Sequence, residues 1–227
     1  MEYHNIMSVH NLYYYAIPGK AEQIRLAFHV AGIEFKNNIV SGESYGKLKE
    51  ELIEKVPQIN IPLLEVDGQY LTESLAILRY VGTVGNLMPS NPFAQGKVDE
   101  GLNLSNDVFS AFGPTFAIAD LAEKIAARQA LCAPDGKISK IMQKMDIIIA
   151  GFSNGHMAGD MLTIGDICWF ALFGLMSCGM IDGFASDYLN QYVNITKFRQ
   201  FIGTNPKVAS RYAKETEGLL FNGFKFE

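Results

Sequence analysis

Cysteine is scarce in this chain of 227 residues, which contains only Cys132, Cys168 and Cys178. No two of them have the spacing of a metal-binding or redox motif, and an odd, sparse count provides no disulfide framework. The chain therefore lacks the signature of a small secreted protein held together by disulfides. Such cysteine usage is typical of a reducing compartment, and we expect a cytoplasmic location.

Basic clusters are also missing from the sequence. The 19 Lys and Arg residues are scattered and are outnumbered by 24 acidic residues, so the formal net charge is −5. Surfaces that bind nucleic acid are usually built from clustered Lys and Arg, and we therefore expect no nucleic acid among the partners. The first residues lack the basic start and the apolar run of a signal peptide, so none is expected.

No hydrophobic run is long enough to cross a membrane. The longest, "ICWFALFGLMSCGMI" from Ile167 to Ile181, is shorter than the roughly 20 residues that a bilayer requires, and Asp166 and Asp182 flank it. We predict that it forms a buried helix, and we expect no membrane partner. Thr163 and Asp166 have the spacing of a capping box, which would begin this helix.

The first forty residues alternate between strand and helix signals. Residues that favour β-structure fill the segment from Ser8 to Tyr15. A helical pattern then starts near Pro18 and ends at Gly32, and a second strand is predicted over 33–40. A strand–helix–strand unit of this kind crosses over right-handed and leaves its two strands parallel.

A polar helix over 43–56 precedes two short strands within 61–72, joined by the hairpin signal Asp67–Gly68, and a helix over 74–84. A linker with two prolines follows at 85–92. Beyond it the sequence offers no convincing strand. Helices are predicted over 93–124, 136–152, 163–181, 195–203 and 205–217. The sequence thus predicts a small α/β domain followed by an all-helical one.

Three segments of the chain resemble the cytosolic glutathione transferase family. They are "NLYYYAIPGKAEQIRLAFHVAGIEF", "NIPLLEVDGQYLTESLAILRYVG" and "LTIGDICWFALF", whose order and separation span nearly the whole chain. Within the family, the tyrosine-using classes and the sigma class in particular are the most similar. The resemblance implies a thioredoxin-like α/β domain over 1–84 that binds glutathione, a linker over 85–92, and an all-α domain over 93–227 that lines a hydrophobic substrate pocket. It also implies a homodimer.

The chemistry of such an enzyme is the activation of a thiol. A free thiol with a pKa of about 8.5 is only about 3% ionised at pH 7, and the thiolate is the nucleophile. Lowering that pKa by about two units requires the site to favour the thiolate by roughly 2.7 kcal/mol. One well-placed hydroxyl donor could supply most of this, because hydrogen bonds to charged groups contribute about 1.5–3 kcal/mol.

Tyr14 carries the catalytic hydroxyl that the resemblance implies, once the family pattern is aligned on "GKAE" at 19–22. Strand alternation places Tyr14 on one face with Leu12, and Tyr13 and Tyr15 on the other. Simple aromatic packing is the alternative for all three tyrosines. The N-terminal domain contains no cysteine, and the turn "YYAIPGK" contains no serine, so cysteine-based and serine-based sites are disfavoured.

Glu73 and Ser74 stand where the predicted helix over 74–84 begins. Small polar and acidic residues at a helix start cap free main-chain N–H groups, which is a sufficient local explanation. The resemblance implies a sharper role. The helix start and the Ser74 hydroxyl would hold the γ-glutamyl carboxylate of glutathione, while Glu73 would pair with its ammonium group.

Two further parts of the glutathione site are implied by the resemblance. Pro62 matches the family's cis-proline, which turns the Ile61 main chain toward the cysteinyl part of glutathione, and Asn60 falls beside the peptide. Tyr45 and Lys49 reproduce a Trp-x-x-x-Lys spacing that meets the glycyl carboxylate. Lys47 is a rival for this last contact, and a solvated charged face is the simpler alternative.

Lys20 replaces an arginine that supports the thiolate electrostatically in tyrosine-using classes, and it keeps the charge without the planar fork. Asp107 matches an acidic residue that reaches across the dimer to the ammonium of the partner's glutathione, or is an ordinary exposed carboxylate. The four histidines have no ligand spacing. Some sigma-like isomerases hold a divalent ion through acidic residues that are here partly Asn103 and Asn106, so we predict no metal.

Together these features predict a cytoplasmic detoxification enzyme that conjugates glutathione, its substrate, to small hydrophobic electrophiles. Two alternatives stay open: a glutathione-dependent isomerase of the prostaglandin D synthase type, and a non-catalytic binding or structural relative. The presence of Tyr14, Glu73 and Ser74 favours catalysis. The sequence does not identify the second substrate, because the aromatic and apolar candidates for its pocket are equally typical of a core. They are Tyr15, Ile17, Phe109, Phe112, Phe116, Phe221 and Phe224.

Overall fold

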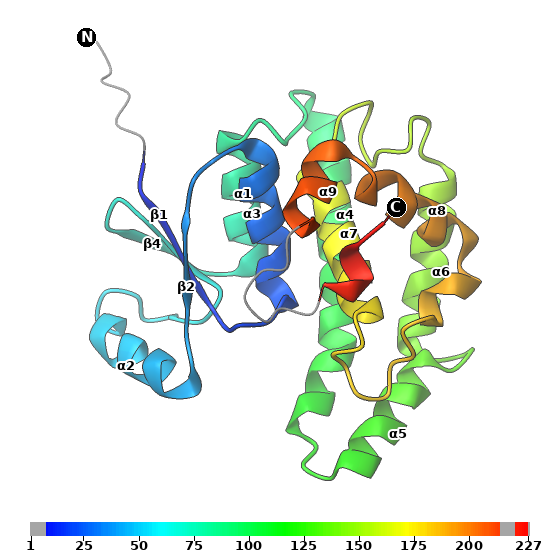
Figure 1. The fold of residues 1–227 in the computed structure, drawn as a ribbon, viewed down its shortest axis with the longest axis horizontal. Coiled ribbons are helices and arrows are strands. Elements are labelled where there is room, and N and C mark those ends of the chain that lie inside the picture. Colours follow the sequence, from blue (N-terminus) through cyan, green and yellow to red (C-terminus); the bar gives the residue numbers. More distant parts are fainter. Residues whose placement is uncertain (1–7, 214–220, 227) are drawn as a thin grey trace.

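The structure is a computed structural model that describes residues 8–213 and 221–226. An α/β part and a helical part lie side by side (Figure 1). The α/β part contains four strands and three helices: β1 (His10–Tyr14), α1 (Glu22–Ala31), β2 (Lys36–Ile39), α2 (Gly42–Leu52), β3 (Leu63–Val66), β4 (Gln69–Leu71) and α3 (Ser74–Val84). This arrangement confirms the predicted fold class, a thioredoxin-like domain followed by an all-α domain.

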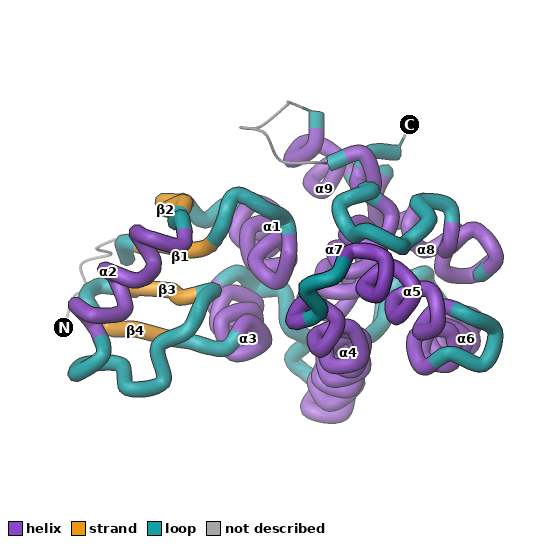
Figure 2. Tube along the Cα trace, turned by 90° about the horizontal axis from the view of Figure 1, so that it is seen from below, coloured by secondary structure: helices purple, strands orange, loops and turns teal. Residues whose placement is uncertain are grey.

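Helices make up the second part of the described chain. They are α4 (Pro92–Phe112), α5 (Leu121–Cys132), α6 (Lys137–Ala150), α7 (Ile164–Ser177), α8 (Val193–Gly203) and α9 (Pro206–Tyr212). Short 3₁₀ helices are η1 (Gly19–Ala21), η2 (Gly113–Ala117), η3 (Tyr188–Gln191) and η4 (Asn222–Phe224). Figure 2 shows α1 and α3 between the sheet and the helical part, with α2 on the opposite face of the sheet.

The sheet has the order β2-β1-β3-β4. β1 and β2 are parallel, as the strand–helix–strand pattern predicts, whereas β1–β3 and β3–β4 are antiparallel. Asp67 and Gly68, which join β3 to β4, have φ of 49° and 79°. Two successive positive φ angles are the requirement of the tight hairpin turn that Asp-Gly favours, so the predicted hairpin is confirmed.

The structure corrects one of the helices predicted in the helical part. The single helix predicted over 93–124 is wrong: α4 ends at Phe112, η2 follows, and a new helix, α5, begins at Leu121. Gly113 and Pro114 interrupt the helical pattern, and the Asp120 side chain accepts a hydrogen bond from the Glu123 N–H, which caps α5. The helix predicted over 205–217 is observed as α9, and residues 214–217 lie outside the described residues.

Helix α7 is the centre of the helical part, and every one of its residues is buried. The predicted capping box is present, because the Thr163 and Asp166 side chains each accept a hydrogen bond from the other's main-chain N–H. One continuous hydrophobic cluster joins α7 to α1 and α3, so the two parts of the molecule share a core. A smaller cluster lies beneath α2 and includes Tyr13 at its edge.

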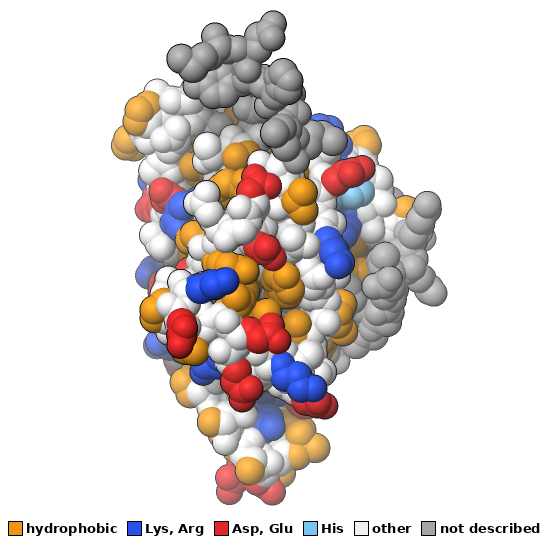
Figure 3. Space-filling model, turned by 90° about the vertical axis from the view of Figure 1, so that its left-hand side faces the viewer, with side chains coloured by type: hydrophobic (Ala, Val, Ile, Leu, Met, Phe, Trp, Pro, Cys, Tyr) orange, Lys and Arg blue, Asp and Glu red, His pale blue; other side chains and the backbone are white. Residues whose placement is uncertain are grey.

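The face that carries the α/β part mixes acidic and basic side chains, with hydrophobic side chains gathered near its centre (Figure 3). Opposite charges are interspersed there, and neither sign dominates. Among the described residues, no helix is long and apolar enough to span a bilayer.

Candidate functional site

Four chain segments meet at one edge of the sheet. β1 ends there at Tyr14, and β2 ends beside it because Ile39 lies opposite Tyr14. β3 begins at the same edge, since Leu63 lies opposite Tyr13, and β4 returns to it at Leu71. The segments that follow or precede these strand ends carry most of the predicted site residues. Tertiary structure therefore gathers at one edge what is spread over some sixty residues of sequence.

Tyr14 is buried, with 8% of its surface exposed, and lies on the same face of β1 as Leu12. Its hydroxyl oxygen accepts a hydrogen bond of 3.2 Å from the main-chain N–H of Lys20. Tyr13 points to the opposite face and donates its hydroxyl to Glu65 at 3.0 Å. The two tyrosines are thus separated by strand alternation, as predicted, into different environments.

Gly19 shapes the turn that brings the Lys20 N–H to Tyr14. Its φ is +44°, and a Cβ at this position would lie 2.6 Å from the Tyr14 hydroxyl. Only glycine combines this backbone conformation with so close an approach. In the sequence this glycine serves only to align the family pattern, and its close packing against Tyr14 is evident only in the structure.

Burial raises the pKa of Tyr14 above its usual value, and the Lys20 N–H and the Arg25 guanidinium only partly offset this rise. The phenol is therefore protonated at neutral pH. Because its oxygen already accepts the Lys20 N–H, the phenol proton is directed elsewhere and remains available as a donor.

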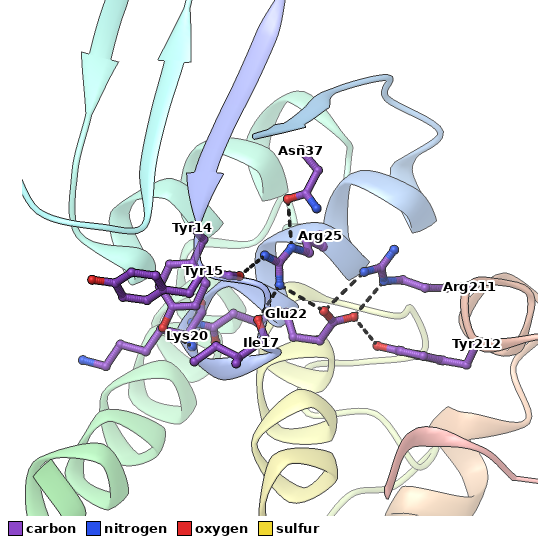
Figure 4. Close-up of polar contacts among 10 residues, drawn as sticks. Tyr14, Tyr15, Ile17, Lys20, Glu22, Arg25, Asn37, Arg211 and Tyr212 are labelled. Carbon is purple, nitrogen blue, oxygen red and sulfur yellow. Dashed lines mark hydrogen bonds and ion pairs between the residues drawn. The ribbon is translucent and has the colours of Figure 1, made fainter. Parts of the chain in front are cut away.

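Arg25 is a buried residue that the sequence analysis missed. Its guanidinium donates hydrogen bonds to the Ile17 carbonyl at 2.8 Å, the Tyr15 carbonyl at 3.1 Å and the Asn37 side chain at 3.0 Å (Figure 4). Its centre lies 5.7 Å from the middle of the Tyr14 ring. It fixes the loop that follows Tyr14. The available signal was an arginine embedded in the apolar pattern of the first helix.

Lys20 and Tyr15 border the same end of β1. The Lys20 ammonium lies 5.3 Å from the centre of the Phe109 ring on α4, so this side chain spans toward the helical part. The Tyr15 ring lies 5.7 Å from that of Tyr14 and 6.3 Å from that of Tyr45 on α2. Tyr15 therefore joins two predicted site residues, Tyr14 and Tyr45, into one aromatic group.

The two lysines predicted as rivals lie on exposed positions of α2. Lys47 forms an ion pair of 2.7 Å with Glu43, one turn earlier on the same helix. No described acidic residue forms such a pair with Lys49. This difference leaves Lys49, on the same helix as Tyr45, the freer of the two ammonium groups.

The Ile61–Pro62 peptide bond is cis, as the resemblance implies. Pro62 precedes β3 directly and is buried beside the end of β1. The Ile61 N–H donates to the side-chain oxygen of Asn60 at 2.9 Å. The Asn60 side chain is exposed, so another acceptor could replace it at the Ile61 N–H.

Glu73 has φ of 68° and ψ of 112°, an uncommon conformation for a residue other than glycine. Its side chain forms no capping hydrogen bond, and it is exposed. Ser74, the first residue of α3, is buried. Helix capping therefore does not account for the Glu73 carboxylate, and non-glycine residues in such backbone conformations cluster at ligand sites.

Asp107 lies on an exposed position of α4, as do Asn103 and Asn106. No described residue forms an ion pair with Asp107. Phe221 and Phe224, two candidates for the second pocket, are buried against Tyr212 and belong to the core. Among the described residues, no three His, Cys, Asp or Glu side chains gather as a metal site.

A shallow cavity of about 440 Å³ lies elsewhere, between α5 and the segment after α7. Cys132 and Tyr188 are among the residues that line it. None of its residues belongs to the sheet edge around Tyr14.

The sequence model described as glutathione S-transferase, N-terminal domain, matches residues 10–83, which hold the whole sheet and its edge. Residues 10–83 are thus similar to the N-terminal domain of glutathione S-transferases. This match confirms the resemblance drawn from the sequence.

Proteins named as glutathione S-transferases and prostaglandin D synthases are similar to this chain over most of its length. Glutathione S-transferase 1 of Ascaris suum is 28% identical over 209 residues, which are 89% of this chain and 94% of the relative. Hematopoietic prostaglandin D synthase of Gallus gallus is 24% identical over 94% of this chain and 100% of the relative. This second relative agrees with the resemblance to the sigma class that the sequence indicates.

Solved structures agree on the fold. The structure of prostaglandin synthase D of Nilaparvata lugens superimposes with a TM-score of 0.78 at 24% identity, over 92% of this chain and 99% of that one. A Necator americanus glutathione S-transferase titled as monomeric gives a TM-score of 0.73, also at 24% identity, over 92% and 98%.

Proposed function

We propose that this protein is a glutathione transferase that binds glutathione at the sheet edge around Tyr14 and conjugates it, through its sulfur, to hydrophobic electrophiles. The observation that carries the proposal is the state of Tyr14. Its phenol is protonated and buried, and its oxygen already accepts the Lys20 N–H, so its proton can be donated to a sulfur anion. A charge-assisted hydrogen bond of this kind contributes about 1.5–3 kcal/mol.

The reaction follows from that hydrogen bond. The thiol of bound glutathione loses its proton to solvent, and the Tyr14 hydroxyl donates to the resulting thiolate. The sulfur electron pair then forms a bond to the electrophilic carbon. With an aryl halide, the carbon–halogen bond breaks and halide leaves. The Lys20 ammonium, which lies near the same strand end, adds positive potential to a site that holds an anion.

Glutathione is held along the sheet edge by the remaining predicted residues. The start of α3 and the Ser74 hydroxyl bind the γ-glutamyl carboxylate, and Glu73 pairs with the ammonium group. The uncommon backbone of Glu73 and its uncapped carboxylate support this role. Asn60, Ile61 and Pro62 contact the cysteinyl part.

The glycyl carboxylate of glutathione is bound from α2. Tyr45 lies there beside the Tyr15 ring, and Lys49 supplies the charge because Lys47 is paired with Glu43. This assignment favours one of the two lysines that the sequence left as rivals.

The protein is further proposed to be a cytoplasmic homodimer in which residues 1–84 bind glutathione and residues 93–227 line the electrophile pocket. Its three free cysteines suit a reducing compartment. In the dimer, Asp107 on the exposed face of α4 would reach the partner's glutathione ammonium. A sedimentation measurement that finds only monomers would remove this role, and one relative's structure is titled as monomeric.

The deciding experiment compares three proteins in the conjugation of an aryl halide to glutathione. Wild type should turn over, and Tyr14→Phe should lose about 10- to 100-fold in kcat, because one hydrogen bond to the thiolate is removed. Tyr13→Phe is the matched control, since it removes a hydroxyl from the same strand but on the opposite face. Equal rates for Tyr14→Phe and Tyr13→Phe would contradict the proposal.

The second candidate function is a glutathione-dependent isomerase. The similarity to hematopoietic prostaglandin D synthase of Gallus gallus over 94% of the chain favours it. Both candidates use the same thiolate. They differ in the product, because an isomerase returns free glutathione, whereas conjugation consumes it stoichiometrically.

A further inference from the structure

Glu22, the first residue of α1, is fully buried and is surrounded by donors. Its carboxylate accepts hydrogen bonds from the Arg211 guanidinium at 2.8 and 3.2 Å and from the Tyr212 hydroxyl at 3.0 Å. An Arg25 nitrogen lies 3.5 Å away on the opposite side (Figure 4). A buried carboxylate is costly unless it is paired in this way, and two of the three partners that the described residues provide belong to α9.

Arg25 continues the chain of contacts from Glu22 to the Tyr14 loop. The guanidinium nitrogen that faces Glu22 also donates to the Ile17 carbonyl, and its neighbour donates to the Tyr15 carbonyl. These two carbonyls lie in the segment between Tyr14 and Gly19. The orientation of Arg25, and with it the course of this segment, is therefore set by a carboxylate that α9 helps to hold.

A second pair joins the same two helices. The His29 ring on α1 lies within hydrogen-bond distance, 2.9 Å, of the Ser210 hydroxyl on α9. Helix α9 is thus seated on α1 by polar contacts at both ends of α1, although some 180 residues of sequence separate them.

We propose that Glu22 and Arg25 are positioning residues that couple the docking of α9 to the placement of the Tyr14 hydroxyl, so that Arg211 and Tyr212 tune glutathione activation without touching substrate. This inference rests on the proposed role of Tyr14. Helix α9 would thereby influence the chemistry of the α/β part. The contacts run from Arg211 to Glu22, from Glu22 to Arg25, and from Arg25 to the loop after Tyr14.

Electrostatics give the coupling its direction. The Lys20 N–H, the Arg25 guanidinium and the Tyr15 ring are the groups that face Tyr14. Without Arg211, Arg25 is the one cationic partner that Glu22 keeps among the described residues, and Glu22 draws it away from the loop carbonyls. The positive potential at Tyr14 then falls, its pKa rises, and its proton becomes a poorer donor to a thiolate.

Three variants test the coupling. Arg211→Met removes the charge and both hydrogen bonds. Arg211→Lys restores the charge without the fork. Tyr212→Phe removes a single hydroxyl while its ring can still pack on Phe221 and Phe224. The matched control is Arg199→Met, which removes a buried arginine of α8 that donates to the Gly223 carbonyl and for which no hydrogen bond or ion pair to the described residues of the Tyr14 loop is found.

Two pH titrations are the readouts, each beside a measurement of thermal stability. One follows the ultraviolet absorbance of the thiolate of bound glutathione. The other follows ionisation of Tyr14 in the free protein, as the difference between each variant and the same variant carrying Tyr14→Phe. Arg211→Met should raise the thiolate midpoint by about one pH unit, which means about tenfold less thiolate at a fixed pH well below the midpoint.

The effects on kcat/KM should rank the variants in the same order as the midpoint shifts. Arg211→Met should lower kcat/KM for glutathione about tenfold, Tyr212→Phe about threefold, and Arg211→Lys should recover part of the loss. Arg199→Met should lower stability alone. If Arg211→Met does not fold, Arg211→Lys and Tyr212→Phe test the coupling instead. Both should shift the thiolate and Tyr14 midpoints in the same direction, by less than is expected of Arg211→Met.

Loss of stability in the α9 variants with unchanged midpoints and kcat/KM would overturn the inference and reduce the network to a structural brace. Failure of the proposed function looks different. In that case wild type itself forms no thiolate and conjugates nothing, whereas the Tyr14 titration in the free protein still reports whether α9 is coupled to Tyr14.

Discussion

Gly19 and Tyr14 are packed so closely that a single methyl group at Gly19 would lie 2.6 Å from the Tyr14 hydroxyl. The glycine also has a φ of +44°, which other residues adopt with strain. Its turn delivers the Lys20 N–H to that hydroxyl. The position of the proposed proton donor is thus defined by a residue that has no side chain.

Gly19→Ala should therefore damage the site more than the fold. The new methyl group displaces the Tyr14 hydroxyl, and we expect glutathione turnover to fall about 10- to 100-fold, since the charged hydrogen bond is lost. Gly32→Ala is the control, because Gly32 has a φ of +69° but open space around its Cβ position. It should lower the free energy of unfolding by about 1 kcal/mol and leave turnover intact. Equal activity of both variants would contradict this prediction.

Two substitutions at Glu73 should separate its effect on glutathione binding from its effect on stability. Glu73→Gln removes the carboxylate and should raise KM for glutathione about tenfold or more, because a charged contact with the ammonium is lost. Glu73→Gly should bind as weakly, yet its melting temperature should not fall, since glycine adopts a φ of 68° without strain. Steady-state kinetics and thermal melts measure the two effects. An unchanged KM in both variants would exclude Glu73 from the site.

Tyr13 should contribute to alkaline unfolding. Burial, followed by its hydrogen bond to Glu65, raises the pKa of Tyr13 to about 12 in the folded protein, whereas the unfolded value is about 10. Because the folded state holds this proton more tightly, the stabilisation is present below pH 10 and is lost as the pH rises toward 12.

Urea unfolding at pH 8 and at pH 11 tests this prediction. Other tyrosines titrate in the same range, so the measured quantity is the difference between wild type and Tyr13→Phe. Wild type should lose more free energy of unfolding between the two pH values than Tyr13→Phe. A parallel decline of both proteins would show that Tyr13 does not contribute.

Asp166 should be among the most costly polar residues to remove. Its buried carboxylate accepts hydrogen bonds from the Met157 N–H at 2.7 Å and from the Thr163 N–H at 2.8 Å. Asp166→Ala leaves these donors unpaired, and we expect a loss of about 3 kcal/mol in the free energy of unfolding. Asp120→Ala, at the exposed start of α5, removes an ordinary cap and should cost about 1 kcal/mol. Denaturant titrations of both variants compare the two losses.

Much of the fold was predictable because its signals are local. Gly32 ends α1 with a φ of 69°, and Asp67 and Gly68 turn the hairpin, each through backbone conformations that these residue types favour. The break between α4 and α5 was not predicted, although Gly113 and Pro114 are residues that commonly end a helix. The apolar pattern on both sides of that pair continues at helical spacing, and periodicity outweighed the breaker.

The candidate site also contains residues that local sequence signals identify and residues that they do not. Tyr14, Glu73 and Ser74 are recognisable from their neighbours in sequence, since strand ends and helix starts place them. The roles of Arg25 and Glu22 were not predicted, because the partners that define them, Arg211 above all, lie nearly two hundred residues away. A charged residue inside an apolar helix face signals that some partner exists, but not which one.

The sequence by itself determined the strand and helix order, the turns and the tyrosine at the end of the first strand, since each depends on residues a few positions apart. Only the tertiary structure decided that a carboxylate at the start of α1 would be paired by α9, and that the same pairing would orient the arginine behind Tyr14. Burying a charge requires a partner that is close in space, and closeness in space across two domains is a property of the folded chain.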